Sequence, residues 1–105
     1  MVRDQLVRRD HSRPNSILIQ SLVRAHGWRR SFESDPSIRI KDLAEDHGVA
    51  NRYAARLLRL AYLAPDITQA ILDGAQPSHL SLKRLLQGVP LSWPEQRQKF
   101  GFPAA

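Results

Sequence analysis

Apolar side chains recur every three or four residues along most of this chain, which is the spacing of an amphipathic helix. The pattern is clearest between residues 15 and 34, where its members are Leu18, Leu22, Ala25, Trp28 and Phe32. Alternation with a period of two, which a half-buried strand requires, never continues for more than a few residues. We therefore expect an all-α fold, a compact bundle of five to six helices.

Glycine and proline divide this pattern into short helices. Asn15 or Ser16 can cap the first helix. Gly48 suits the end of the second, because a glycine commonly follows the last helical residue. Pro65 suits the first turn of a helix. The segments that we expect to be helical are residues 15–34, 38–48, about 51–62, 65–74, 78–88 and 92–102.

The length of 105 residues favours one domain. We expect a flexible basic arm over residues 1–14 and a single helical domain over residues 15–105. The arm is rich in charged and polar residues and stops at Pro14; it is either a contact to phosphates or a solvated tail. The chain has no cysteine, which excludes a disulfide framework, a thiol nucleophile and a cysteine-based zinc site.

Positive charge dominates the composition. Lysine and arginine number 16 against 10 acidic residues, the net charge is +6, and 13 of the basic residues are arginine. The planar fork of a guanidinium matches phosphate and guanine edges better than an ammonium does, so this balance suits a polyanionic partner such as nucleic acid. On charge alone, a basic domain with no nucleic-acid role is an equal alternative. No apolar run is long enough for a signal peptide or a membrane span. We expect a cytoplasmic, nucleoid-associated chain with no membrane partner.

The twenty residues from Ile40 to Arg59 fit a helix-turn-helix, in which two short helices cross at a tight turn. Ala44, the fifth position, is small, as it must be where the second helix crosses the first. Gly48, the ninth, takes the turn, where a positive φ is cheap only for glycine. The apolar residues that would fill the joint are Leu43, Val49, Ala54 and Leu57. We place the unit at about residues 40–60.

Three arginines share one ridge of the second helix of this unit. At about 100° per residue, Arg56 lies roughly 40° and Arg59 roughly 20° from Arg52, and the apolar residues fall on the opposite face. Like charges four residues apart destabilise an isolated helix by about 0.2–0.5 kcal/mol per pair. The ridge is therefore either a solvated face, a set of partners for acids elsewhere in the fold, or a surface for an external anion.

A helix-turn-helix presents its second helix to the major groove of double-stranded DNA. The residues that we expect at the DNA are Lys41, Asn51, Arg52, Ala55, Arg56 and Arg59. We assign Arg52 and Arg56 to bases, because a guanidinium donates two hydrogen bonds to a guanine edge. Arg59 and Lys41 are assigned to phosphates, with Arg39 as a further candidate. Asn51 either contacts adenine or caps the helix.

The stretch "IKDLAEDHGVANRYAARLLRLAYLAPDITQAILDG" resembles the helix-turn-helix of ParB-type partition proteins. The matched elements are Leu43-Ala44, Gly48-Val49, the RLLRL run that begins at Arg56, and Pro65-Asp66-Ile67. A closer resemblance covers about residues 13–102. There "RAHGWRR", "AILDGAQPSHLSLKRLL" and "LSWPEQRQKFGF" are similar to the C-terminal tail module of bacterial and prophage-encoded serine recombinase-like proteins. The resemblance implies an all-helical DNA-binding module of a phage or mobile element.

Three departures limit what the resemblance implies. The tail module usually follows a catalytic resolvase domain and a zinc ribbon, and this chain contains neither, so recombinase chemistry is not carried over. The nucleotide-binding domain of ParB proteins is also absent, so partition activity is not implied. In addition, Ala50 stands where the family commonly has serine or threonine. One helix-capping oxygen is therefore missing, and Asn51 is a candidate substitute.

The sequence contains no motif for catalysis or metal binding. No HExxH, Walker or GxSxG pattern is present, and no metal-ligand spacing joins the histidines, which are His11, His26, His47 and His79. Asp42, Glu45 and Asp46 resemble a nuclease metal cluster at first sight, but acids near a helix N-terminus also stabilise that helix. We expect no enzymatic activity, no cofactor, no metal and no small-molecule substrate.

Two classes of function remain. The first is sequence-specific binding of double-stranded DNA, as a transcription regulator of a phage or mobile element or as a recombination accessory module, with a homodimer left open. The alternative is a protein–protein interaction module built on a helix-turn-helix scaffold, with Trp93 and Phe100 at its interface. Exposed arginines on a continuous positive surface would favour DNA. Pairing of the same arginines with internal acids would favour the alternative.

Overall fold

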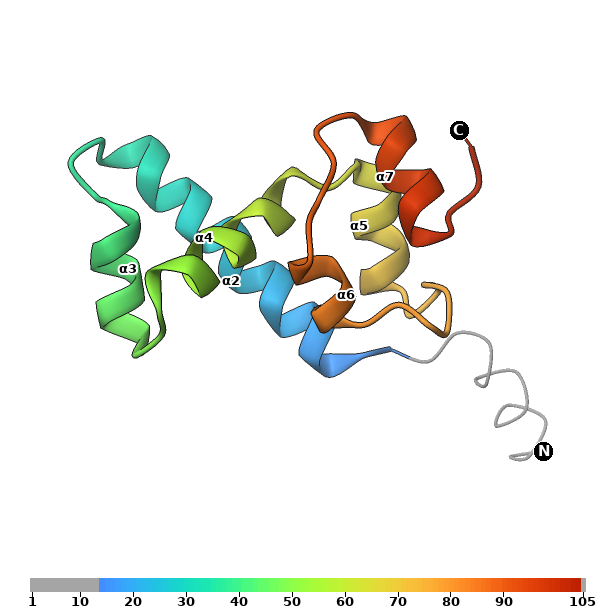
Figure 1. Cartoon of the computed structure of the whole chain (residues 1–105), viewed down its shortest axis with the longest axis horizontal. Coiled ribbons are helices and arrows are strands. Elements are labelled where there is room, and N and C mark those ends of the chain that lie inside the picture. The colour runs from blue at the N-terminus through green and yellow to red at the C-terminus, as the bar shows by residue number, and fades with distance from the viewer. Residues whose placement is uncertain (1–13, 105) are drawn as a thin grey trace.

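The computed structural model describes residues 14–104, and this part of the chain is helical with no strand (Figure 1). The all-α prediction is therefore confirmed. The predicted arm over residues 1–14 lies outside the described residues except for Pro14. The elements are the α-helices α2 (Ser16–Ser34), α3 (Ile40–His47), α4 (Asn51–Leu58), α5 (Pro65–Leu72), α6 (Leu82–Leu86) and α7 (Trp93–Phe100), with a 3₁₀ helix, η1 (Arg59–Tyr62), directly after α4.

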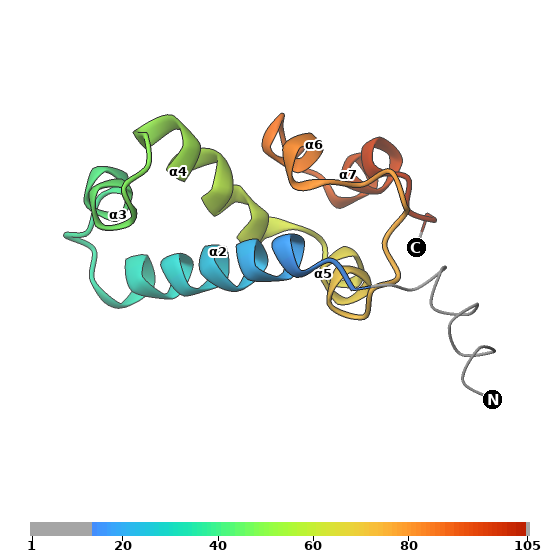
Figure 2. The ribbon, with the colours of Figure 1, turned by 90° about the horizontal axis from the view of Figure 1, so that it is seen from below.

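The long helix α2 supports the rest of the fold. Helices α4, α5 and α6 and the 3₁₀ helix η1 all pack against it, whereas α3 packs mainly against α4. Figure 1 places α3 at one end of the molecule and α5 and α7 at the other. Figure 2 shows α4 and α6 on the same side of α2. No helix in the described residues combines the length and the apolar character needed to cross a bilayer.

The predicted apolar stripe of α2 lies in the core. Leu18, Leu22, Ala25 and Trp28 are buried, and Phe32 is half-buried against them. The start of the helix is capped by Asn15, whose side-chain oxygen accepts hydrogen bonds from two backbone amides at 3.1 Å. The helices that follow add further buried side chains, which include Leu57, Leu60, Ile67, Ile71, Leu85 and Phe100.

The turn between α3 and α4 forms as the sequence predicts. Gly48 has a φ of 65°, in the left-handed region. Its amide donates to the carbonyl of Glu45 at 3.2 Å, and the amide of Val49 donates to the carbonyl of Ala44 at 3.0 Å. This pair of bonds is a Schellman motif, which satisfies carbonyls at the end of a helix. The motif sets the direction in which α4 leaves the turn.

The end of α4 differs from the prediction of a continuous helix to Tyr62. The α-helix stops at Leu58, and the chain continues as the 3₁₀ helix η1. Ala64 has an extended backbone, with a ψ of 145°. A residue that precedes a proline is pushed out of the helical region, so the helix has to end before Pro65. A short 3₁₀ turn is a common way to end one.

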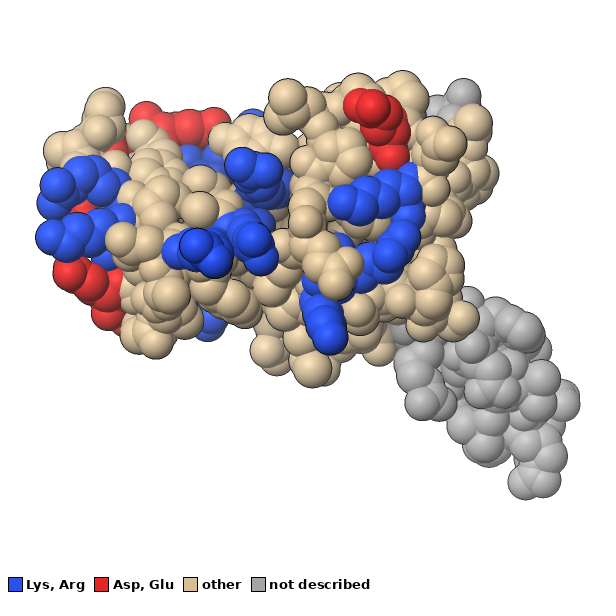
Figure 3. All heavy atoms as spheres, viewed as in Figure 1, with Lys and Arg blue, Asp and Glu red and all other residues tan. Residues whose placement is uncertain are grey.

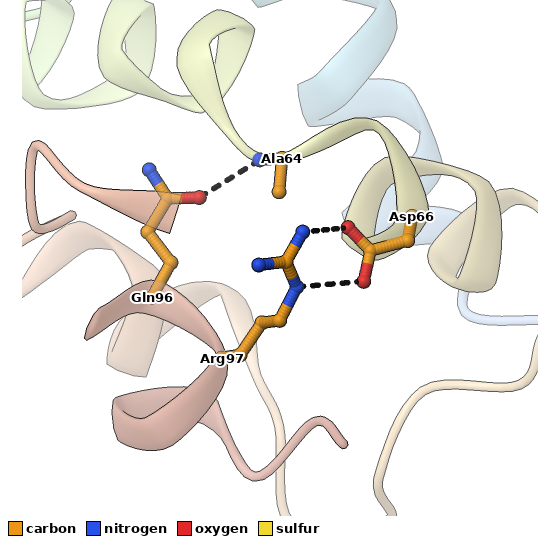
Figure 4. Close-up of polar contacts among 4 residues, drawn as sticks. All are labelled: Ala64, Asp66, Gln96 and Arg97. Carbon is orange, nitrogen blue, oxygen red and sulfur yellow. Dashed lines mark hydrogen bonds and ion pairs between the residues drawn. The ribbon is translucent and has the colours of Figure 1, made fainter. Parts of the chain in front are cut away.

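One buried glutamine joins three separate backbone segments. Gln96 of α7 is 1% exposed and is the single buried polar side chain among the described residues. Its Oε1 accepts from the amide of Ala64 at 2.8 Å (Figure 4). Its Nε2 donates to the carbonyls of Tyr62 at 3.2 Å and Pro90 at 2.8 Å. These bonds attach α7 and the segment before it to the junction of η1 and α5.

A second contact reinforces the same junction from the exposed side. The Nε and NH2 groups of Arg97 each donate to the carboxylate of Asp66 at 2.9 Å (Figure 4). The Arg97 side chain is 13% exposed and the Asp66 side chain is 47% exposed. Hydrogen bonding to Arg97 holds the pKa of Asp66 below its ordinary value. Asp66 also lies in the first turn of α5, where an acid stabilises a helix.

We predict opposite effects for alanine at two glycines. Gly48→Ala should lower the free energy of unfolding by about 1–2 kcal/mol, because an L residue is strained in the left-handed region. The added methyl would meet no atom within 4 Å, so no clash contributes. Gly27→Ala, inside α2, should raise it by about 0.5–1 kcal/mol. Urea denaturation followed by circular dichroism measures both, and equal stability of Gly48→Ala and wild type would contradict the turn geometry.

The structural role of Gln96 can be tested with Gln96→Leu. The change leaves the buried amide of Ala64 without an acceptor, which should cost about 1–3 kcal/mol for that group alone. Gln98→Leu, at an exposed position of the same helix, is the matched control and should stay within about 0.5 kcal/mol of wild type. Hydrogen exchange adds a local readout. Protection of the Ala64 amide should fall in Gln96→Leu, and unchanged protection would argue against the bond.

The pH dependence of stability should report the Asp66–Arg97 pair. Because the pKa of Asp66 is lower in the folded chain than in the unfolded chain, the unfolded chain takes up the proton first as the pH falls. The stabilisation from Asp66 is therefore complete at neutral pH and is lost below about pH 4. Asp66→Asn should be less stable than wild type at pH 7, and the difference should shrink in acid. Asp46→Asn, at an exposed position, is the control, and a pH-independent difference for Asp66→Asn would refute the assignment.

Candidate functional site

The three arginines of the predicted ridge are exposed, and none has a partner within residues 14–104. Arg52 and Arg56 lie on α4, and Arg59 begins η1. None of the three makes a hydrogen bond or an ion pair with any residue in the range 14–104. The ion pairs found in that range are Arg29–Glu33, Arg39–Asp42 and Arg97–Asp66. Internal acids in the described part of the chain therefore do not neutralise the ridge.

The ridge is exposed because the opposite face of α4 is fully used by the core. Ala54 is 0% exposed and Leu57 is 1% exposed. Both pack into the cluster that holds Leu43 and Ala44 of α3, as the helix-turn-helix pattern predicts. With that face fixed, residues offset by about half a helical turn, such as Arg52 and Arg56, have to point away from the core. Packing at the joint therefore decides which side chains of α4 reach solvent.

Helix α6 lies beside the ridge and forms a hollow with it. The hollow has a volume of about 330 Å³ and is lined by Arg52, Ala55, Arg56 and Arg59, facing residues 85–89 at the end of α6. Four of the six predicted site residues are therefore brought together. Lys41 is exposed on α3, and Asn51 is the first residue of α4; neither lines this hollow. The sequence predicts only one exposed face of α4, and the structure shows that the end of α6 lies opposite that face.

The capping role considered for Asn51 is not found. The N-cap position of α4 belongs to Ala50, which has an extended backbone (φ −71°, ψ 151°) and no capping side chain. Asn51 already lies inside the helix, so its side chain does not take the place of the missing oxygen. The helices α2, α6 and α7 have side-chain caps from Asn15, Ser81 and Ser92. The start of α4 therefore keeps amide groups with no side-chain acceptor.

Two residues beside the ridge are not among the predicted site residues. Tyr53 is 37% exposed, and with Lys83 of α6 it lines a second hollow of about 410 Å³ next to Arg56. Tyr53 lies one position from Arg52, so its partial exposure follows from the geometry of the helix. No signal in the sequence places Lys83 near α4, because that proximity depends on how residues 59–81, which separate the two helices, bring α6 back to α4.

The positive charge of the ridge continues onto neighbouring elements. Figure 3 shows lysine and arginine side chains across the face that carries α4 and α6, with no acidic side chain in the middle of that face. Two of the cations near α6 are anchored by backbone carbonyls. Lys99 donates to Gly88 at 2.9 Å, and Arg84 donates to Lys99 at 3.0 Å. These bonds hold the two charges at the surface without neutralising them.

The acidic residues of α3 have a structural use. The Asp42 carboxylate accepts from the backbone amide of Arg39 at 2.9 Å, which caps the start of α3. Within the described residues, no three histidine or acidic side chains are close enough to hold a metal ion. His47 lies at the end of α3. Its ring centroid is 5.0 Å from that of Trp28, and its Nδ1 is 3.0 Å from the carbonyl of Leu43.

The aromatic pair considered for a protein interface is separated by the structure. Phe100 is 0% exposed and belongs to the core, so the prediction of an interface role for it is wrong. Its position at the end of α7 directs it inward, on the same side of the helix as Gln96. Trp93, at the start of α7, is 48% exposed. Only Trp93 of this pair is available to a partner.

The candidate functional site therefore consists of the arginine ridge and the hollow beside it. The resemblance to ParB-type helix-turn-helix units and to recombinase tail modules stays a prediction from the sequence. No family model, no curated protein and no solved structure matches this chain.

Proposed function

We propose that this chain binds double-stranded DNA sequence-specifically through α3 and α4, with α4 in the major groove. The observation that carries the proposal is the exposed ridge of Arg52, Arg56 and Arg59, which has no partner among residues 14–104. Holding like charges together on one helix opposes folding. A bound polyanion would neutralise these charges, and the release of its counterions would favour binding.

The roles of the site residues follow from their positions. Arg52 and Arg56 lie on the part of α4 that would enter the groove, so we assign them to base edges, where a bidentate bond to guanine gives about 1–3 kcal/mol of discrimination. Arg59 lies at the far end of the ridge, and Lys41 lies on the preceding helix. Both suit phosphates, which fix the register of a protein on the duplex. The side chain of Ala55 is small, so it lets the DNA approach the helix closely between the arginines.

The surface around the ridge supports the same proposal. Lys83 of α6 lies beside Arg56 across the second hollow, so it can add a phosphate contact on one flank. The uncapped amides at the start of α4 point outward from the helix end, and helix N-termini commonly donate to phosphates. These groups add affinity without adding sequence information. One helix-turn-helix reads few base pairs, and two copies on two half-sites would read more.

The biological setting is proposed from the resemblance. A small DNA-binding chain of this kind suits a regulator of a phage or mobile element, or an accessory module of a recombination system. The alternative, a protein–protein interaction module, is favoured by one observation. Leu91 is 98% exposed and Trp93 is 48% exposed, and the two lie close together in sequence. Both residues line a groove that Arg59 of the ridge also lines, so a partner bound there would reach the edge of the ridge.

Selection from a random pool of duplexes tests the proposal. We expect a short enriched motif, and a binding constant that falls with salt by about 0.9 logarithmic units per phosphate contacted for each tenfold rise in salt. An enriched palindrome would indicate a symmetric dimer. If no duplex is enriched and binding is weak at physiological salt, the ridge does not read DNA and the protein-interaction alternative gains.

Substitution of one arginine separates recognition from stability. Arg56→Ala should weaken binding of the selected duplex by about 1–3 kcal/mol and relax the preference at one base pair, with unchanged urea stability. Arg24→Ala, at an exposed position of α2, removes the same charge away from the ridge and should leave the base preference intact. Leu57→Ala should instead lower stability by about 2–5 kcal/mol, because this leucine is buried. Equal duplex selectivity of Arg56→Ala and wild type would remove the assignment to bases.

A further inference from the structure

A larger groove lies on the other side of Arg59 from the hollow of the ridge. It has a volume of about 830 Å³ and is formed by α2, η1, α5 and the segment that leads into α7. This volume is within the range of about 300–1,000 Å³ that small-molecule sites occupy. Its walls are mainly apolar, and they include the side chains of Tyr62, Leu91 and Trp93. Of the residues that line this groove, the function proposed above uses Arg59 alone.

The apolar side chains of the groove are unusually exposed. Tyr62 is 56% exposed, Trp93 is 48% exposed and Leu91 is 98% exposed. Single exposed apolar residues are ordinary, but several around one concavity indicate a binding surface. The backbone that carries them is fixed, because Gln96 binds the carbonyls of Tyr62 and Pro90. The groove is therefore a built feature of the fold and does not depend on the position of a loose loop.

The charges at the groove have a single sign. Arg29 and Arg59 line it, and no acidic side chain in residues 14–104 does. Arg29 also pairs with Glu33 at 3.2 Å, so Arg59 is the lining cation that no acid in residues 14–104 neutralises. Arg29 is held in place, because it donates to the carbonyl of Ala61 at 3.1 Å and lies 5.2 Å from the centre of the Tyr62 ring. Arg59 is unpaired. An apolar groove with cations and no anions on its walls matches a ligand with an apolar body and a negative group.

A covered polar atom in the wall of the groove also lacks a partner. His26 lines the groove, and its Nε2 is buried without a hydrogen bond within the described residues. Burial and the nearby Arg29 and Arg30 lower the pKa of His26. The ring is therefore neutral at neutral pH, and its Nε2 can either donate or accept a hydrogen bond. A ligand with a polar group beside its apolar body could satisfy this atom.

We propose that this groove binds a small organic anion with an aromatic or aliphatic body. The body would lie against Tyr62 and Trp93, and the carboxylate, sulfonate or phosphate group would bind Arg59. A second copy of the chain is the less favourable occupant, because a net charge of +6 opposes self-association at a surface lined by arginines. The ligand is bound and not converted, so no chemistry is required of the groove.

The position of Arg59 couples the two surfaces. Arg59 lines the groove and also the hollow beside α4. One guanidinium that binds a ligand anion is not available to a DNA phosphate, so the ligand and the duplex should oppose each other. Such coupling is reciprocal, since each ligand lowers the affinity for the other by the same factor. This part of the inference rests on the proposed DNA binding, whereas ligand binding itself does not.

A matched pair of fluorescent probes tests the groove. Anilinonaphthalene sulfonate is an aromatic anion, and N-phenylnaphthylamine has the same aromatic body without the charge. We expect the anion to bind the folded protein at one saturable site and more tightly than the neutral probe. Arg59→Gln should weaken binding of the anion about tenfold, as expected for loss of a charge-assisted hydrogen bond, and should leave the neutral probe unchanged. Arg24→Gln is the charge-matched control and should leave both probes unchanged.

Other results would overturn the proposal. Equal affinity for the two probes, or equal weakening of the anion by Arg59→Gln and Arg24→Gln, would show that Arg59 does not hold the anion. Dimerisation in sedimentation experiments that Trp93→Ala abolishes would assign the groove to a second copy. The probe experiment contains no DNA, so its outcome is independent of the proposed function. Release of the bound anion by a selected duplex would then support the coupling, and its persistence under saturating duplex would refute the coupling alone.

Discussion

A buried amide side chain determines how the C-terminal half of this fold closes. Gln96 accepts from the amide of Ala64 and donates to the carbonyl of Tyr62, which lie on the two sides of the break between η1 and α5, and it also donates to the carbonyl of Pro90 before α7. The two groups at the break cannot bond within a helix, because Pro65 forces the chain out of the helical conformation just there. A buried amide or carbonyl without a partner is costly, so the break and the glutamine depend on each other. These hydrogen bonds fix the position of α7 and of the segment before it, which forms one wall of the groove.

Packing against the core explains why one face of α4 is apolar and buried and the other is charged and exposed. Its apolar residues meet α2 and α3, and nothing in the described chain covers its arginines. A helix of eight residues is too short to be stable alone, so α4 exists because its apolar face is buried. The fold therefore supplies the stability that permits a ridge of like charges. The ridge can be altered by substitution with less risk to the fold than the face beneath it.

Much of this architecture was accessible from local patterns. The stripe of α2, the turn at Gly48 and the start of α4 depend on spacings and residue types within a few positions, and all three are where the sequence predicts them. Two of the failures arise from contacts between distant residues, because the burial of Phe100 and the wall that α6 gives to the ridge depend on how the C-terminal segment returns to α4. The 3₁₀ turn of η1 is a local effect, since Pro65 forces the helix to end before it. Gln96 also escaped prediction, because a glutamine in a polar helix gives no sign of burial.

The groove could not be predicted for the same reason. Its walls come from α2, from η1 and from the segment before α7, which are far apart in the sequence. Exposed Tyr62 and Trp93 look in the sequence like ordinary members of amphipathic helices. Only their arrangement around a concavity, together with arginines and without acids, distinguishes them from core residues that are incompletely covered.

The missing cap at Ala50 has a consequence for how this protein would evolve. An N-cap of serine, threonine, asparagine or aspartate is worth about 1 kcal/mol to a helix, and α4 does without it. A serine at this position would tighten the first turn, but its oxygen would also occupy amide donors that a phosphate could otherwise use. Selection for stability and selection for affinity would then act in opposite directions on one side chain. The alanine leaves the first turn of α4 without a side-chain cap, so its amides stay available to an acceptor from outside the helix.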